Sequence, residues 1–169
     1  ASTMQIMAEA LGLALPGSAL MPATSPDLLD YAKEAGKQAV RLAQMEHMRP
    51  SDIVTMDSFE NAILVHAAIS GSTNCLLHLP AIAAEAGLDM DCWAVYDQAS
   101  RELPVLADLC AEEQNVLFHF TQAGGLSALM AEMKEHLDLS CVDVSGRTLA
   151  QKLEGKASRD TAVIHTVKE

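Results

Sequence analysis

Residues 59–86 read FENAILVHAAISGSTNCLLHLPAIAAEA, and this stretch decides the fold. Its first part, residues 59–69, is apolar around most of a helical circumference, which is typical of a helix in the interior of a domain. A second apolar helix is expected over residues 75–86. Because residues 70–74 between them are small and polar, the pattern predicts two buried helices that meet at one polar turn.

Helical periodicity continues on both sides of this pair. The further expected helices are residues 4–15, 26–48, 91–101, 118–136 and 148–154. Expected N-caps are Ser2 or Thr3 for the first helix, Ser25 for the second, and Asp57 or Ser58 for the helix at residues 59–69. Pro16-Gly17 is expected to end the first helix. The pair Gly124-Gly125 indicates either a helix start near Thr121 or a close contact with another helix at the glycines.

Two short apolar segments predict strands. They are residues 103–107, which are bounded by charges, and residues 162–164 near the end of the chain. The expected fold class is therefore mainly α, with a few short strands that belong to a small α/β layer. The length of 169 residues fits one domain and leaves little room for two independent cores.

Composition limits the classes of function. Half of the residues are hydrophobic and 4% are aromatic, a mixture that favours helices and excludes a wholly disordered chain. Because the net charge is −12 and the chain has no basic run, nucleic acid is not an expected partner. No apolar stretch is long enough to span a membrane, so a membrane partner is not expected either.

The cysteines and histidines form no metal-binding motif. The four cysteines are widely spaced, with no CxxC pair, and we expect reduced, buried thiols and a cytoplasmic protein. The four are Cys75, Cys92, Cys110 and Cys141. The six histidines show neither HxH nor HExxH spacing. His66 and His78 are the exception of interest, since both flank the polar turn.

The polar turn Ser72-Thr73-Asn74 has two interpretations. Its hydroxyls, amide and free N–H groups at the start of a buried helix can form a small corner that binds an anion or a hydroxyl group. The same residue types also cap helices, and capping alone accounts for their presence. The chain has no GxSxG, P-loop or dinucleotide fingerprint, so its motifs contain no complete active site.

Five groups of residues, in order, resemble one enzyme family. They are ASTMQ and AEALGLALPG within residues 1–17, FENA at 59–62, GSTN with LHL at 71–79, AGG at 123–125, and SGRTL at 145–149. Together they resemble the dihydroxy-acid dehydratase and phosphogluconate dehydratase family. The resemblance covers nearly the whole chain.

The resemblance implies a hydro-lyase that dehydrates a 2,3-dihydroxy acid to a 2-keto acid. In such enzymes an iron–sulfur cluster acts as a Lewis acid on the departing 3-hydroxyl, and Mg²⁺ holds the carboxylate and the 2-hydroxyl. A base removes the proton at carbon 2. The partner implied is a small dihydroxy or sugar acid, and the assembly implied is a homo-oligomer.

The resemblance also implies that residues 1–169 are a partial N-terminal dehydratase domain without the C-terminal β-barrel domain. The chain starts ASTM without an initiator Met and runs directly into an amphipathic pattern, so we expect a cut within a longer protein. The family's cluster cysteines and most Mg²⁺ ligands would lie upstream of Ala1, and its remaining ligand and base beyond Glu169. None of the four cysteines matches a ligand position, so we expect no catalytic residue or metal ligand here and no activity from this chain alone.

Within the chain, the resemblance implies that the first helix lies beside the cluster loop. Ser2 and Thr3 are therefore the residues expected nearest the chemistry. Ser72, Thr73 and Asn74 of the polar turn are the second choice. Relatives often have a glycine where this chain has Ser70, which departs from the family pattern at the edge of that turn.

Two further expectations concern the class of function. The Ala-Ser-Thr-Met motif and the Pro-Gly-Ser-Ala loop resemble the sugar-acid branch, whose substrates are aldonic acids such as xylonate, more than the branched-chain amino-acid branch. The competing hypothesis is a non-catalytic helical interaction module that resembles the family only in its helix pattern.

Overall fold

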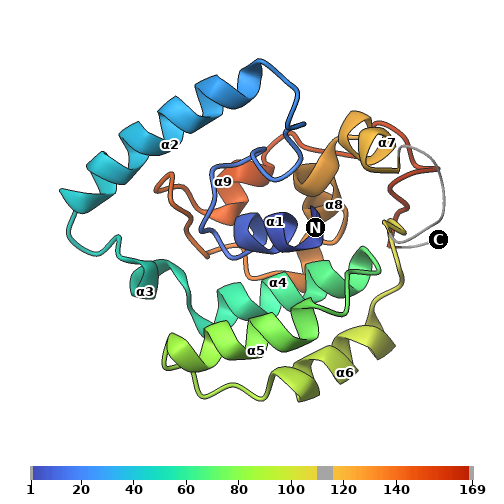
Figure 1. Ribbon diagram of the computed structural model, residues 1–169. Coiled ribbons are helices and arrows are strands. Elements are labelled where there is room, and N and C mark those ends of the chain that lie inside the picture. The colour runs from blue at the N-terminus through green and yellow to red at the C-terminus, as the bar shows by residue number, and fades with distance from the viewer. Residues whose placement is uncertain (1, 110–115, 168–169) are drawn as a thin grey trace.

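The computed structural model describes residues 2–109 and 116–167, which form a helical assembly (Figure 1). The helices in these ranges are α1 (Ser2–Ala10), α2 (Asp27–Ala43), α3 (Pro50–Ile53), α4 (Met56–Ala68), α5 (Cys75–Glu85), α6 (Cys92–Glu102), α7 (Val116–Gln122), α8 (Gly125–Glu132), the 3₁₀ helix η1 (Lys134–His136) and α9 (Leu149–Leu153). The β-type pairing in the same ranges is one isolated antiparallel bridge, between Val142 and Thr148. The prediction of a mainly helical chain is confirmed.

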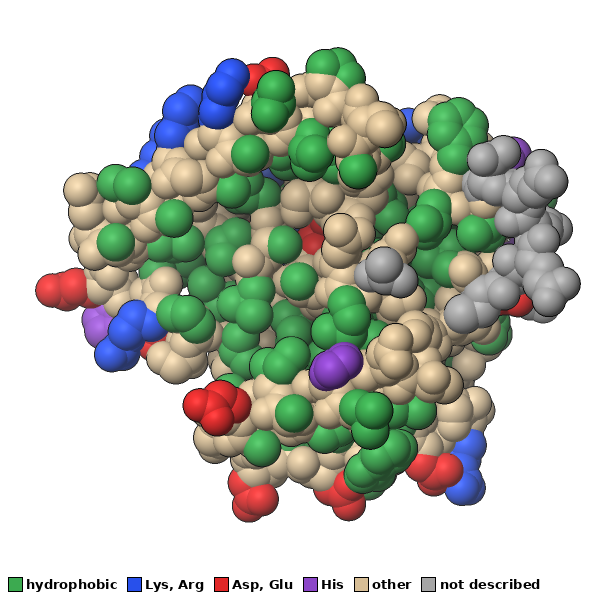
Figure 2. All heavy atoms as spheres, viewed as in Figure 1, with side chains coloured by type: hydrophobic (Ala, Val, Ile, Leu, Met, Phe, Trp, Pro, Cys, Tyr) green, Lys and Arg blue, Asp and Glu red, His purple; other side chains and the backbone are tan. Residues whose placement is uncertain are grey.

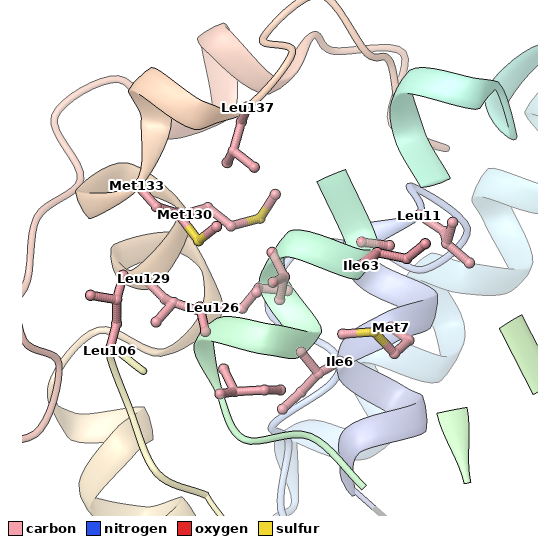
Figure 3. Close-up of a cluster of buried hydrophobic side chains, with 14 of the residues drawn as sticks. Ile6, Met7, Leu11, Ile63, Leu106, Leu126, Leu129, Met130, Met133 and Leu137 are labelled. Carbon is pink, nitrogen blue, oxygen red and sulfur yellow. The ribbon is translucent and has the colours of Figure 1, made fainter. Parts of the chain in front are cut away.

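Helix α4 occupies the centre of the core, as its apolar circumference predicted. Phe59 and Ile63 have no exposed surface, and α4 packs against α1 and α6. Figure 3 shows Ile6 and Met7 of α1 beside Ile63, with side chains of α8 such as Leu129 gathered on the other side of the cluster. Burial of each such side chain stabilises the fold by about 1.5–3 kcal/mol, so α4 holds the N-terminal and C-terminal halves together.

The N-cap of α4 is Thr55, and the predicted caps Asp57 and Ser58 are wrong. The Thr55 side chain accepts a hydrogen bond from the Ser58 N–H at 3.2 Å, and the Ser58 hydroxyl accepts one from the Thr55 N–H at 2.8 Å. This reciprocal pair is a capping box. Ser58 therefore takes part in the cap from inside the first turn.

Helix α1 ends at Ala10, five residues before its predicted end. The chain turns at Gly12, whose φ is +82°, and the Gly12 carbonyl accepts a hydrogen bond from the Val144 N–H at 2.8 Å. A Cβ at Gly12 would lie 2.9 Å from the Val142 carbonyl oxygen, so only glycine fits this close approach. The long-range contact overrides the helical pattern of residues 11–15.

Helix α2 also ends early, at Ala43 instead of residue 48, and none of its side chains is buried. Leu29 and Val40 are 68% and 61% exposed. Packing supplies most of the stability of helices in proteins. Because α2 buries no side chain, the helix does not continue through residues 44–48. Figure 2 shows Lys and Arg along the outer edge of α2 and hydrophobic side chains across the middle of this face. The apolar stripe of α2 lies beside an open groove of about 340 Å³ that residues 13–18 border.

The two predicted strands are wrong. Residues 103–107 have no strand geometry, and the N–H groups of Leu106 and Ala107 donate to the Ala68 carbonyl at the end of α4, at 2.8 and 3.0 Å. Residues 162–164 form a turn. One hydrogen bond joins the two regions, from the His165 N–H to the Leu106 carbonyl at 2.8 Å. Part of each segment is buried, including Leu106 and Ile164, but Val105 is 47% exposed. The backbone partner of Leu106 and Ala107 is the end of α4 instead of a neighbouring strand.

The glycine pair separates α7 from α8, so a helix start near Thr121 is wrong. Gly124 and Gly125 both have positive φ, of +118° and +61°. A Cβ at Gly125 would lie 2.8 Å from Cδ1 of Leu20. The close approach at Gly125 is to Leu20 of the loop between α1 and α2, whereas the second interpretation expected a helix.

Candidate functional site

The polar turn joins the two apolar helices α4 and α5. Ser70 has a φ of +50°, and the Gly71 N–H donates to the His66 carbonyl at 3.0 Å, which ends α4 sharply. The Ser72 carbonyl then accepts the N–H of Cys75 at 3.0 Å, at the start of α5. The turn reverses the chain within a few residues, as its small polar side chains predicted.

The structure brings the two predicted groups of site residues together. The Ser72 N–H donates to the Thr3 hydroxyl at 3.3 Å, which links α1 to the turn. Next to this bond, the Cys75 thiol donates to the Met4 sulfur at 3.3 Å. Ser2 and Thr3 are both partly exposed. Two segments 69 residues apart in sequence thus form one surface.

His66 of α4 packs against the turn and contacts the backbone of Ser72. It is 6% exposed, and its Nε2 lies 3.0 Å from the Ser72 carbonyl oxygen. Burial lowers the pKa of the His66 imidazole below its ordinary value of 6.5, and the hydrogen bond to Ser72 partly offsets that effect. His78 is exposed on the surface of α5, so the structure places only one of the two flanking histidines at the turn.

Tyr96 of α6 lies behind His66. The two rings pack edge to face with centroids 5.3 Å apart. The Tyr96 hydroxyl is buried and has no hydrogen-bond partner among the described residues, and burial raises its pKa. Tyr96 therefore fixes the imidazole by its ring and not by its hydroxyl.

Thr73 and Asn74 project from the turn. Both are exposed, and within residues 2–109 and 116–167 neither side chain makes a hydrogen bond. Asn74 occupies the N-cap position of α5 without a side-chain capping bond. The Ser72 hydroxyl accepts the Asn74 N–H at a long 3.4 Å. Capping alone therefore does not account for the hydroxyl of Thr73 or the amide of Asn74, which stay available to a ligand.

The described part of the chain does not fit a metal or cluster site by itself. No three or more His, Cys, Asp or Glu side chains in it lie close enough together to hold a metal ion. Cys75, Cys92 and Cys141 are free thiols, and burial raises the pKa of each. Cys110 lies outside the described residues. The site contributes hydroxyl, amide and backbone groups.

Glu9 is a buried acid that the sequence analysis did not identify. It is 5% exposed and accepts hydrogen bonds from the N–H groups of Gly17 and Ala19, at 2.8 and 3.0 Å. Burial raises its pKa, and these two bonds partly oppose that rise. Glu9 lies three residues after Ile6, on the apolar face of α1, and this position was the feature of the sequence that could have indicated a buried acid. Glu9 anchors the loop that follows α1.

The described residues include no helix with the length and hydropathy to cross a membrane. The groove beside α2 contains none of the five candidate residues, so this groove and the candidate site are separate.

Comparison with known proteins points to one family. The model of the N-terminal part of dihydroxy-acid/6-phosphogluconate dehydratases matches residues 1–152. A dihydroxy-acid dehydratase of Moorella thermoacetica is 40% identical over the whole chain and 31% of its own length. Dihydroxy-acid dehydratase 1 of Methanosarcina acetivorans is 42% identical over 91% of this chain and 28% of its own length. The chain thus spans less than a third of these relatives.

Proposed function

Because this chain belongs to the dihydroxy-acid/6-phosphogluconate dehydratase family, we propose that it forms part of the N-terminal domain of a hydro-lyase. The enzyme would convert a 2,3-dihydroxy acid into a 2-keto acid. The match of the family's N-terminal model to residues 1–152 carries this proposal. Residues 1–169 make up the partial domain, and the C-terminal domain belongs to the rest of the enzyme.

We place the contribution of this chain to the active site on the surface that α1 shares with the polar turn. Thr3 accepts the Ser72 N–H, and the side chains of Thr73 and Asn74 make no hydrogen bond within the described ranges. Hydroxyl and amide groups suit the hydroxyls and carboxylate of a dihydroxy acid, because they both donate and accept hydrogen bonds. Ser2 and Thr3 remain the residues proposed to lie nearest the reacting groups.

The cofactors proposed for the whole enzyme are an iron–sulfur cluster and Mg²⁺. The described residues bring no suitable ligand set together, so these groups would take their ligands from other parts of the enzyme. We therefore expect residues 1–169 alone to give no turnover. A reducing compartment such as the cytoplasm suits the three free thiols, and a homo-oligomer is the proposed assembly.

The substrate has two candidate classes. The Ala-Ser-Thr-Met motif and the Pro-Gly-Ser-Ala loop favour an aldonic acid, such as xylonate. The relatives carry the name dihydroxy-acid dehydratase, which names a dihydroxy acid as the substrate class of those proteins. We propose the general class, a 2,3-dihydroxy acid, and keep the sugar acid as the second candidate because of the two motifs.

A chimera tests the proposal. Residues 1–169 replace the aligned segment of the Moorella thermoacetica relative, which is 40% identical. We expect the folded chimera to form a 2-keto acid from a 2,3-dihydroxy acid, with aldonic and branched-chain acids assayed side by side. The parent enzyme is the positive control. A chimera that folds and assembles like the parent but forms no keto acid from either class would refute the proposal.

A further inference from the structure

The peptide groups on both sides of Ser72 are held by side chains from different helices. Thr3 of α1 accepts the Ser72 N–H at 3.3 Å. The His66 imidazole of α4 lies 3.0 Å from the Ser72 carbonyl oxygen, which also accepts the Cys75 N–H. The orientation of the turn is thus set by its surroundings as well as by its own sequence.

We propose that His66 is the positioning residue of this turn, and that it sets where Thr73 and Asn74 present their side chains. The contact of those two residues with a dihydroxy acid rests on the proposed function. The contact of His66 with Ser72 is independent of the proposed function. His66 touches no substrate in this proposal and acts through the Ser72 carbonyl.

The hydrogen bond defines the state of the imidazole. A carbonyl oxygen only accepts, so Nε2 must carry the proton and donate. In the neutral ring this leaves Nδ1 without a proton, which matches the preference of a buried imidazole for the uncharged form. The ring is held on its other side by Tyr96.

Gly71 makes room for this arrangement. A Cβ at position 71 would overlap the imidazole and lie 2.5 Å from its Nε2. The φ of Gly71 is not in the left-handed region, so the backbone itself would accept alanine. Position 71 therefore lacks a side chain because the His66 imidazole occupies that space. The residue types at positions 66 and 71 depend on each other.

Amide hydrogen exchange on the 169-residue chain tests the proposal directly. In His66→Leu we expect the Ser72 and Cys75 amides to exchange at least about tenfold faster, since loss of one supporting hydrogen bond is worth about that factor. His66→Gln keeps a donor and should restore most of the protection. Ile63→Val, a buried change elsewhere in α4, is the control for general loss of stability. Wild-type exchange at both amides in His66→Leu would overturn the proposal.

If His66→Leu does not fold, Gly71→Ala tests the same contact. In Gly71→Ala the ring must move, so the ¹⁵N signals of His66 should lose the Nε2–H signature of the wild type. The amide of Ser72 should lose protection at the same time. In the double variant His66→Ala, Gly71→Ala, the added methyl should cost little beyond His66→Ala alone. Additive losses of stability would show that the two positions are independent, against the proposal.

The chimera separates this inference from the proposed function. If it forms keto acid, His66→Leu should raise KM or lower kcat at least about tenfold, and His66→Gln should recover most of that loss. Wild-type kcat and KM in His66→Leu would overturn the functional half of the proposal. If the folded chimera forms no keto acid, the proposed function fails, while the exchange measurements still decide whether His66 positions the turn.

Discussion

The Thr3 hydroxyl accepts a hydrogen bond from the backbone N–H of Ser72 at 3.3 Å, across 69 residues of sequence. This bond joins the first helix of the chain to the turn between α4 and α5. Both residues were separate candidates by resemblance, and the structure places them in contact. A change in the position of α1 is therefore transmitted directly to the turn.

Thr3→Val removes this acceptor and keeps the shape of the side chain. We expect the free energy of unfolding to fall by about 1 kcal/mol, because the Ser72 N–H loses its partner. Thr3→Ser retains the hydroxyl and should stay close to the wild type. Urea denaturation of the three proteins measures the difference. Equal stability of Thr3→Val and wild type would mean that the bond contributes nothing.

His66 should make the stability depend on pH in one direction. Its folded pKa lies below the ordinary 6.5, so between these two values the unfolded chain binds more protons. This contribution to the free energy of unfolding is full above pH 6.5 and is lost as the pH falls through the folded pKa. His66→Gln should reduce that slope in denaturation curves. His78→Gln, at an exposed histidine, should keep it.

Glu9 should act in the opposite direction. Its folded pKa is raised above the ordinary 4.5, so the folded chain holds its proton to higher pH than the unfolded chain. The stabilisation is full below pH 4.5 and is lost as the pH rises through the folded pKa. Glu9→Gln should remove this dependence, and Glu85→Gln on the exposed surface of α5 should not. An unchanged profile in Glu9→Gln would contradict the assignment.

Asn61 joins α4 to the segment after η1 and should be costly to remove. Its amide donates to the Asp138 carbonyl at 2.8 Å and accepts the Asp138 N–H at 2.9 Å, and it is 2% exposed. Asn61→Ala leaves two backbone groups without partners, so we expect a loss of about 2–3 kcal/mol. Asn74→Ala, at an asparagine whose side chain makes no hydrogen bond, should cost little. Thermal and urea unfolding compare the two.

Cys141 should react slowly with alkylating reagents. Burial raises the pKa of its thiol from 9.0 to about 11, so near pH 8 the thiolate fraction is about a hundredfold below that of an ordinary cysteine. Peptide mapping after treatment with iodoacetamide measures the rate at this position. The same protein in denaturant is the control and should react about a hundredfold faster. Equal rates in the folded and unfolded states would show that the thiol is not protected.

Local patterns predicted the helices well where burial and periodicity agree. The apolar circumference of residues 59–69 placed α4 in the core, and the caps at Asp91 and Thr148 start α6 and α9 close to the predicted positions. The predicted strand at residues 103–107 failed for a physical reason. Leu106 and Ala107 are buried, but their N–H groups pair with the end of α4, a partner that periodicity does not reveal.

The candidate site was predicted in its residue types but not in its geometry. Polar residues at 72–74 were visible as a motif, and the sequence favoured capping over the binding of a ligand as their role. The contacts of Ser72 with Thr3 and His66 depend on how α1 and α4 pack, which local pattern does not encode. Glu9 was missed because a single acid on an apolar helical face has no motif of its own.

Helix α2 contributes no buried side chain, although it is the longest helix in the described ranges. Exposed residues of α2 can therefore be substituted without disturbing the packing around α4. The turn at Ser72 should stay unchanged when charges are reversed or a fluorophore is attached along the outer edge of α2. This helix is therefore a suitable site for labelling or immobilising the domain.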